Sequence, residues 1–341
     1  MKEIKINRLP APTWRWLKVN DRNVKVPEAF VPAVTDDRTE NLLTEAASAD
    51  QAEGKSGLGD VFAEVIEASQ VPARIYSIRG TQGRLYFRNH YTEDYMLARE
   101  EIRAEAGSRA LIVMEADGTG TNGAHDIRIS LEEGAKLTLV EVIRVDHAGV
   151  FLDGVYTEAA DKAEFNLIQL VLGGGDVCLG EMVKLSGREA ACRVDIGYLL
   201  DGNKEFDVNA VAEHTGKNTN SRIGISGVVD GTAKKTFRGT LDFVKGAAGA
   251  KGEVRDNVLL MSDEVVNRTI PLILCGEEDV EGEHGATIGK ISDEAMFYFA
   301  TRGIPEEQVA KMMARSMVDQ VIAKIPDETL RRELLGEEDI V

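Results

Sequence analysis

Short runs in which every second residue is apolar dominate the chain from about residue 71 to residue 274. Phe165, Leu167 and Val171 share one face of such a run, and the apolar residues of 237–243 do the same. A period of two residues is typical of β-strands, because successive side chains of a strand point to opposite faces. Roughly a dozen such runs, separated by segments rich in Gly, Asp, Asn and Lys, predict a mainly β region.

The connections between these runs limit the architecture. No helical segment between them is long enough to serve as a crossover, which excludes a doubly wound α/β sheet and leaves a sandwich, a barrel or a β-solenoid. Asn122-Gly123 is the only Asn-Gly hairpin signal. Turns such as EEGAK, DGNK and VDGTAKK instead lead into a charged and then an apolar residue. We therefore expect the repeated coils of a parallel β-helix, with an irregular repeat.

The chain before this region has a different pattern. Residues 1–70 contain four prolines, and we expect an extended strip anchored by Trp14 and Trp16. A polar, alanine-rich linker or lid follows over 35–57. Apolar residues then recur at helical spacing over 58–66, which predicts one amphipathic helix.

The chain after the strands is predicted to be helical. Ser292 is a suitable N-cap for a helix over 293–301, which Gly303 would end. A second helix starts at Pro305, and a third, short one lies between Pro326 and Gly336. We thus expect a short N-terminal region (1–70), a β-helix core (71–290) and a C-terminal helical region (291–341). The second helix carries one apolar stripe, made of Val309, Met312, Met313, Met317, Val321 and Ile325.

The charge balance excludes some partners. The 341 residues include 40 basic and 58 acidic side chains, a formal net charge of -18. Such a surface repels polyanions, so neither a nucleic acid nor an anionic membrane is an expected partner. The first residues lack an apolar segment and no run of 18 apolar residues occurs, so we expect a cytoplasmic protein.

The three cysteines, Cys178, Cys192 and Cys275, are odd in number and far apart. No CxxC pair exists, so neither a disulfide framework nor a structural zinc site is indicated. Cys192 alternates in phase with the apolar Val194 and Ile196, so we expect it to pack in the core, with a sulfur-relay role as the alternative. The pattern does not place Cys178.

The histidines divide into two groups. His90, His125 and His147 lie near charged or turn residues and are expected at the surface. His214 begins the polar segment EHTGKNTNS, where turn hydrogen bonding is a better interpretation than catalysis.

Cys275, Glu283 and His284 form the candidate chemical site. Cys275 ends the apolar run PLILC, and the acidic turn GEEDVEG separates it from Glu283 and His284. A strand-turn-strand hairpin would bring the three together, and a thiolate, a carboxylate and an imidazole can bind iron or zinc. Residue types alone favour the alternative of a buried cysteine and a solvated acidic loop.

The segment Met296-Phe297-Tyr298-Phe299 is apolar on more than one helical face. Exposed aromatic and methionine side chains are typical of docking surfaces, so we expect a protein partner here. The alternative is that these helices only cap the β-region.

Several motifs taken in order resemble one family. The segment EHGATIGKISDEAMFYFATRGIPEEQVAKMM, preceded by HTGKNTNSRIGISGVVDG, FRGTLDF, NVLLMSDE and PLILC, is similar to the SufB/SufD proteins, scaffold subunits of the SUF iron-sulfur cluster assembly system. The resemblance implies a right-handed parallel β-helix with helical ends and no catalysis of its own. It also implies a dimer of related subunits and a C-terminal helical region that binds the SUF-type ABC ATPase.

The resemblance also assigns roles. Cys275 matches the cysteine of the cluster or persulfide site, Glu283 a nearby acid and His284 the histidine of an HGAT motif, whereas Gly285 stands where SufB-type chains place a second acid. A homodimer could supply both halves of the site, and pairing with a paralogue is the alternative. The ATPase-docking surface would comprise Met296, Phe297, Tyr298, Phe299, Arg302, Met312 and Met313.

The function expected from these motifs is a scaffold that takes sulfur from a donor protein and iron to hold a transient iron-sulfur cluster. Flavin use is not specified by the sequence. One alternative is a structural partner subunit without its own cluster site. The other is a β-helix enzyme acting on polysaccharides, for which a cytoplasmic chain is poorly placed.

Overall fold

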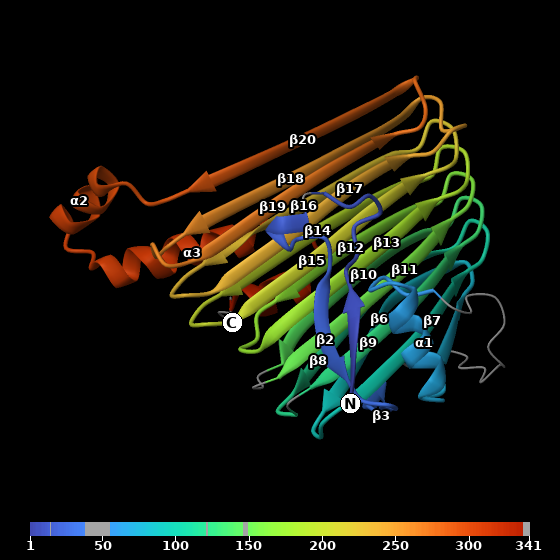
Figure 1. The fold of residues 1–341 in the computed structure, drawn as a ribbon, viewed down its shortest axis with the longest axis horizontal. Coiled ribbons are helices and arrows are strands. Elements are labelled where there is room, and N and C mark those ends of the chain that lie inside the picture. The colour runs from blue at the N-terminus through green and yellow to red at the C-terminus, as the bar shows by residue number, and fades with distance from the viewer. Residues whose placement is uncertain (14, 38–54, 121, 146–148, 337–341) are drawn as a thin grey trace.

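The computed structural model describes residues 1–13, 15–37, 55–120, 122–145 and 149–336. In this part the chain forms two nine-stranded sheets, in which all pairs but one are parallel, and a small antiparallel ribbon of β1 (Lys2–Ile6) and β2 (Arg22–Val26) (Figure 1). The sheets are wound by successive coils, so the predicted mainly β solenoid is confirmed. Parallel pairing excludes the sandwich and barrel built from hairpins.

Consecutive strands alternate between the two sheets. One sheet runs in the order β20 (Val280–Gly289), β18 (Ala250–Leu260), β16 (Asn220–Val229), β14 (Ala191–Leu200), β12 (Glu164–Val171), β10 (Lys136–Val145), β8 (Arg109–Gly118), β6 (Thr81–Tyr91) and β4 (Val34–Asp37). The other runs β19 (Val266–Cys275), β17 (Lys234–Phe243), β15 (Glu205–His214), β13 (Asp176–Leu185), β11 (Val150–Ala159), β9 (Gly123–Leu131), β7 (Met96–Ala104) and β3 (Val31–Pro32), with β5 (Arg74–Ile78) also paired to β7.

Each coil therefore contributes one strand to each sheet. Lys136 of β10, for example, pairs with Glu164 of β12, 28 residues later. Gly134, Gly202 and Gly231 have positive φ in the turns EEGAK, DGNK and VDGTAKK. Glycine adopts this left-handed conformation at little cost, which explains why these segments end strands.

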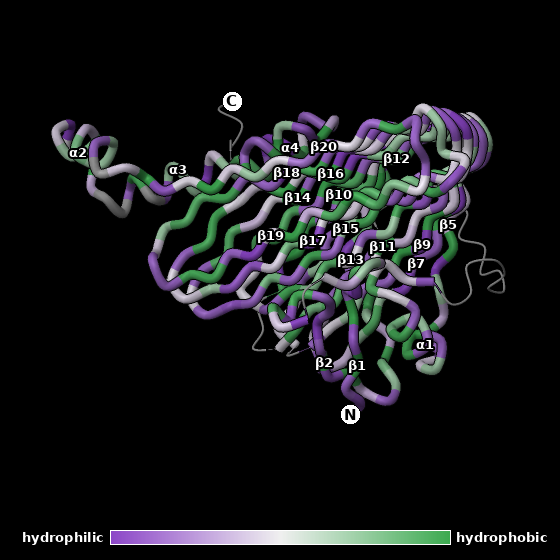
Figure 2. Tube along the Cα trace, turned by 45° about the horizontal axis from the view of Figure 1, so that its top comes forward, coloured by the Kyte–Doolittle hydropathy of each residue, from purple (hydrophilic) through white to green (hydrophobic). Residues whose placement is uncertain are grey.

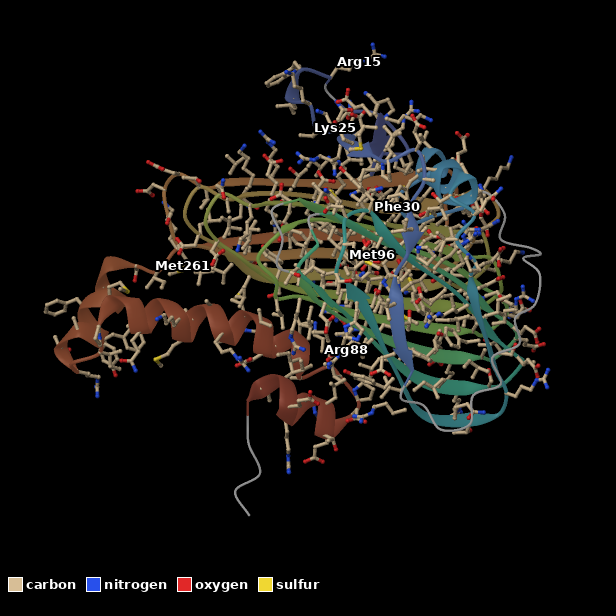
Figure 3. The ribbon with its side chains drawn as sticks, turned by 90° about the horizontal axis from the view of Figure 1, so that it is seen from below. Arg15, Lys25, Phe30, Arg88, Met96 and Met261 are labelled. Atoms are coloured by element: carbon tan, nitrogen blue, oxygen red, sulfur yellow. The ribbon has the colours of Figure 1, made fainter. Side chains whose placement is uncertain are left out.

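Every second residue of a strand faces the lumen between the sheets. Figure 2 shows hydrophobic and hydrophilic residues alternating along the strands. Cys192, Val194 and Ile196 of β14 belong to the large apolar cluster of the lumen, so core packing of Cys192 is confirmed. Side chains fill the space between the sheets (Figure 3), and their burial supplies the main stabilisation of the stack.

The predicted N-terminal helix is α1 (Asp60–Ala68). Phe62, Val65 and Ile66 pack on the outer face of the second sheet, where they contact the cluster that contains Leu152 and Cys178. Cys178 is thus buried under the N-terminal region.

The aromatic anchor expected near the N-terminus is wrong for Trp16. This residue belongs to η1 (Arg15–Leu17), a single turn with no buried residue, and it is 71% exposed. The turn lies outside the β1–β2 ribbon, which packs through Ile4, Val24 and Val26 instead. Trp14 and most of the linker over 35–57 lie outside the described residues.

The C-terminal helices are α2 (Asp293–Thr301), α3 (Glu306–Ile322) and α4 (Glu328–Leu335). The Ser292 hydroxyl accepts a hydrogen bond from Ala295 N, and Gly303 and Gly336 have positive φ. The predicted cap and helix ends are therefore confirmed. None of the described helices is both long and apolar enough to span a membrane.

α3 packs its second half on the outer face of the first sheet. Val318, Val321 and Ile322 belong to an apolar cluster with Val140 and Ile168 of the sheet. Within the predicted stripe, Val309 and Val321 are buried, whereas Met312 is 50% exposed. Figure 1 shows the reason: α2 and the start of α3 lie beyond the strands, so no sheet covers this part of the helix.

Candidate functional site

The last coil of the solenoid is open. β19 and β20 each stand at the end of their sheet and pair on one side only, with β17 and β18. None of the residues of β19 or β20 is fully buried, and Ile288 of β20 is 58% exposed. Unpaired edge strands of this length are suited to pairing with another chain.

Cys275 is the last residue of β19 and its side chain is exposed. It pairs in register with Phe243, a fully buried lumen residue, so the thiol continues a lumen-facing column at the open end. The predicted position at a strand end is confirmed. The alternative of a buried cysteine is excluded.

His284 and Glu283 point to opposite faces of β20. His284 pairs with Val254, which belongs to the lumen cluster, whereas Glu283 pairs with Glu253 on the outer face. Adjacent residues of a strand alternate in this way. The imidazole therefore shares the lumen side with Cys275, and the carboxylate of Glu283 does not.

The expected hairpin of the two strands is wrong, because β19 and β20 belong to different sheets. A methyl group added at Gly282 would lie 3.1 Å from Ile273 Cγ2, so these two positions face each other across the lumen. Cys275 comes two residues after Ile273 in β19, and His284 comes two residues after Gly282 in β20. Because the two strands run in opposite directions, Cys275 and His284 lie on opposite sides of this level. The two side chains of one chain are thus separated by roughly 13 Å along the strands.

The turn after Cys275 is strongly acidic. Glu277, Glu278 and Asp279 lie between the thiol and β20. Hydrogen bonds from the backbone N–H groups of Gly246 and Glu278 hold the pKa of Glu277 below its usual value, so it stays ionised. These carboxylates attract cations to the thiol.

The other two thiols are unsuited to the same chemistry. Burial raises the pKa of Cys192 to about 12 and raises that of Cys178 as well. A thiol reacts and binds metal as the thiolate, which these positions disfavour. Among the cysteines, Cys275 alone is exposed.

The predicted docking residues lie on the projecting helices. Phe297 is 71% and Tyr298 52% exposed. The Arg302 guanidinium lies 4.4 Å from the centre of the Tyr298 ring. Arg302 is exposed, and Met296, Phe299 and Met313 are partly buried.

The histidines include one correction. His214 is buried and its ring nitrogens bond the hydroxyls of Thr219 and Ser221, which confirms turn hydrogen bonding. His90 is partly exposed beside Asp117, and His147 lies outside the described residues. His125, expected at the surface, is buried in the lumen.

The signal for His125 was its phase, since it alternates with Ile127, Ile129 and Leu131, all of which face the lumen. In the part of the chain that the structure describes, His125, Glu141 and Asp153 are the group of His, Cys, Asp and Glu whose ligand atoms lie within 4.8 Å of one another. Residue spacing along the chain does not predict this group, because its members come from three different strands.

A parallel β-solenoid with an exposed thiol on an open last coil is the class of protein that fold and site define. The model of the SufBD core domain, described as SUF system FeS cluster assembly, matches residues 87–317. This range is more than half of the chain, and the chain belongs to the SufBD family. The membership confirms the resemblance found in its motifs.

Curated relatives agree. The chain is 28% identical over 257 residues to the iron-sulfur cluster assembly SufBD family protein ABCI8, chloroplastic, of Arabidopsis thaliana, covering 71% of this chain and 46% of that protein. It is 27% identical over 166 residues to the iron-sulfur cluster assembly protein SufD of Escherichia coli, covering 49% and 39%. It is 32% identical over 130 residues to the SufBD family protein ycf24 of Trieres chinensis, covering 38% and 27%. The matched part spans less than half of each of these relatives.

Proposed function

We propose that the chain is a scaffold component of SUF-type iron-sulfur cluster assembly, which receives sulfur and iron at Cys275 in a site shared by two subunits. Membership of the SufBD family supports the general role in cluster assembly. The single observation that carries the finer proposal is the exposed Cys275 on an unpaired last coil. The cluster is cargo of this site.

Sulfur transfer requires a thiolate that a donor protein can reach. The Cys275 thiolate would attack the outer sulfur of a persulfide on the donor protein. A new S–S bond forms at Cys275, and the donor cysteine leaves as its thiolate. Exposure at the end of β19 supports this role, whereas burial removes Cys178 and Cys192 from it.

A twofold pair of solenoids would complete the site. If two β20 strands run antiparallel about Gly282, residue 280 of one chain lies opposite residue 284 of the other. Cys275 lies at the level of residue 280, so this pairing would bring the thiol to the level of the partner's His284. The separation of Cys275 and His284 within one chain supports such sharing. A paralogous subunit with the same open end is the alternative partner.

The donor set suits a transient cluster. Two chains would offer two thiolates and two imidazoles, fewer thiolates than the four that usually hold a resident cluster. Glu283, on the outer face of β20, would hold iron on its way to the thiol together with the acidic turn. In this proposal His284 ligates iron or moves a proton.

The projecting helices would bind the ABC-type ATPase. The exposed Phe297, Tyr298 and Met312 support this proposal, together with the partly buried Met296, Phe299 and Met313 and the exposed Arg302. α2 lies beyond the C-terminal end of β20, the last strand of the open coil (Figure 1). A partner bound to α2 would therefore be near this end and could influence how two solenoids meet.

The substitution Cys275→Ser tests the proposed function. After anaerobic treatment with iron and sulfide, we expect the variant to hold roughly one tenth of the cluster of the unchanged chain, because no thiolate remains at the open end. Visible absorption and transfer of the cluster to an apo-ferredoxin are the measurements. Cys192→Ala, which removes a buried thiol, is the matched control and should keep its cluster. Equal absorption of Cys275→Ser and the unchanged chain would refute the proposal.

A further inference from the structure

A group of ionisable side chains lies inside the solenoid, far in sequence from the open end. His125 of β9, Glu141 of β10 and Asp153 of β11 all face the lumen and are at most 2% exposed. Glu100 of β7 and Glu181 of β13 face the same space and are each 1% exposed. Four carboxylates therefore surround one imidazole in a region without solvent.

Most of the carboxylate oxygens of this group lack a protein donor. Both oxygens of Asp153, both oxygens of Glu181 and Oε1 of Glu141 are buried and accept no hydrogen bond from the described residues. Among the described residues, the ion pairs of Glu100, Glu141 and Asp153 involve His125 alone. A buried carboxylate without a partner is costly, so these oxygens indicate a missing positive ligand.

The histidine is oriented as a metal ligand. His125 Nε2 lies 2.8 Å from Glu100 Oε2, and Nδ1 lies 3.4 Å from Glu141 Oε1 and 3.8 Å from Asp153 Oδ1. In the tautomer protonated at Nε2, the ring donates to Glu100 and its Nδ1 lone pair is free for a metal ion. A carboxylate behind the ring is the usual partner of a metal-bound histidine.

The spacing of the donors fits an ion between them. Metal bonds of about 2.0–2.2 Å in a tetrahedral site place the ligand atoms about 3.4 Å apart. Gln169 Nε2 donates to Glu141 Oε2 at 3.0 Å, which leaves Oε1 for the ion. Glu181 of β13 pairs with Val155, the next lumen-facing residue of β11 after Asp153. It is therefore the fourth candidate ligand.

We propose that His125, Glu141 and Asp153 bind one divalent first-row transition metal ion inside the solenoid, with Glu181 as fourth ligand and Glu100 as the positioning residue of the histidine. One imidazole with carboxylates suits Zn²⁺, Fe²⁺, Co²⁺ or Mn²⁺ rather than a soft ion. The site is separate from Cys275 and needs no thiolate. Because the lumen is closed by its own coils, the ion enters while the chain folds.

Cobalt is the probe. The full chain carrying Cys275→Ser and His284→Ala, which removes the open end as a competing site, is unfolded with a chelator and refolded with Co²⁺. We expect one Co²⁺ per chain, which persists against chelator in the folded protein. Its visible bands should be those of nitrogen and oxygen ligands, without a thiolate charge-transfer band. Failure to retain any Co²⁺ would overturn the proposal.

Two further variants in this background test the ligands. Asp153→Asn should abolish retained Co²⁺, and Glu100→Gln should weaken binding about 10- to 100-fold, as expected for a residue that acts through a ligand. Asp263→Asn is the matched control, because it makes the same change at an exposed carboxylate outside the lumen. Full Co²⁺ retention in Asp153→Asn would overturn the assignment.

Anomalous diffraction keeps the proposal testable if a variant does not fold. Crystals of the refolded Cys275→Ser/His284→Ala chain should show the cobalt peak between His125 Nδ1, Glu141 and Asp153. A peak elsewhere, with this position empty, would overturn the proposal whether or not Cys275 proves to be the cluster site.

Discussion

One buried ion pair inside the solenoid links the strands of the last coils. Lys235 of β17 donates to Asp256 of β18 at 2.5 Å, and the hydroxyl of Thr269 in β19 donates to the same carboxylate oxygen. Both charged groups are at most 1% exposed. Because removing either partner would leave a buried charge unpaired, this contact fixes the register of the last coils.

His214 makes the stability of the fold depend on pH. Burial lowers its pKa to about 4, from about 6.5 in an unfolded chain. Between these values the unfolded state binds the proton more strongly, so stability is complete above pH 6.5 and falls as the pH drops towards 4. The loss attributable to this group is about 3 kcal/mol.

Denaturant unfolding at pH 7.5, 5 and 4 checks this prediction. His214→Gln should be less stable than the unchanged chain at pH 7.5 and should lose less stability on acidification. His90→Gln, at a partly exposed histidine, serves as the control and should follow the unchanged chain. Parallel pH profiles for His214→Gln and the unchanged chain would contradict the expectation.

Single residues also mark the limit of prediction from sequence. Cys192 was placed correctly because its apolar neighbours on alternate positions define the face. His125 stands in the same phase as apolar lumen residues, yet its charged and turn neighbours suggested a surface, and nothing in the sequence singled out Glu141 and Asp153. Their proximity depends on which strands are neighbours, and a single sequence does not report strand pairing.

Among the elements, strands were predicted well and their faces poorly. Eight of the nine residues of β9 are buried, because the outer face of this strand lies under the N-terminal region. Alternation therefore does not separate the lumen from a covered outer face. Helix ends were predictable since Ser292, Gly303 and Gly336 act locally. Which residues of the α3 stripe are covered was not predictable, because this depends on where the sheet beneath α3 ends.

α2 is the element on which we expect the ATPase to depend most. Phe297→Ala combined with Tyr298→Ala removes the two most exposed aromatic side chains of the helix. Such anchors typically contribute 2 kcal/mol or more, so binding should weaken at least about 30-fold. Co-purification and titration with the ABC-type ATPase are the measurements.

Val61→Ala on α1 is the control for this pair, since Val61 is an exposed apolar residue, 40% accessible, on the N-terminal helix. It should bind the ATPase as the unchanged chain does. Undiminished binding by the α2 double variant, with its circular dichroism unchanged, would exclude α2 as the docking element.

For the whole molecule, the open end predicts how subunits associate. Ile288 lies on the lumen-facing side of β20, where the open end leaves it exposed, and Ile288→Lys places a charge there. In a twofold contact the charge appears twice, so self-association should weaken roughly 100-fold, or about 3 kcal/mol. Light scattering after size-exclusion chromatography should show monomers.

Leu199→Lys is the corresponding control, at a residue 36% exposed on β14 in the wall of the solenoid. It should leave the association state unchanged. A dimer that survives Ile288→Lys at the same concentration would place the contact elsewhere. The family resemblance implied such a dimer, whereas the hairpin expected from the residue spacing joined Cys275 and His284 within one chain.

The two ends of the stack differ. The first coil is bordered by the short strands β3 and β5 in one sheet and by the four-residue, antiparallel β4 in the other, which offer little edge to another chain. If two open ends pair as proposed, neither outer end of the dimer offers a long edge strand, so we expect growth to stop at two molecules rather than continue into fibres. A second copy and a paralogue would then compete for the same open end, and the relative abundance of the two proteins would determine which complex the cell contains.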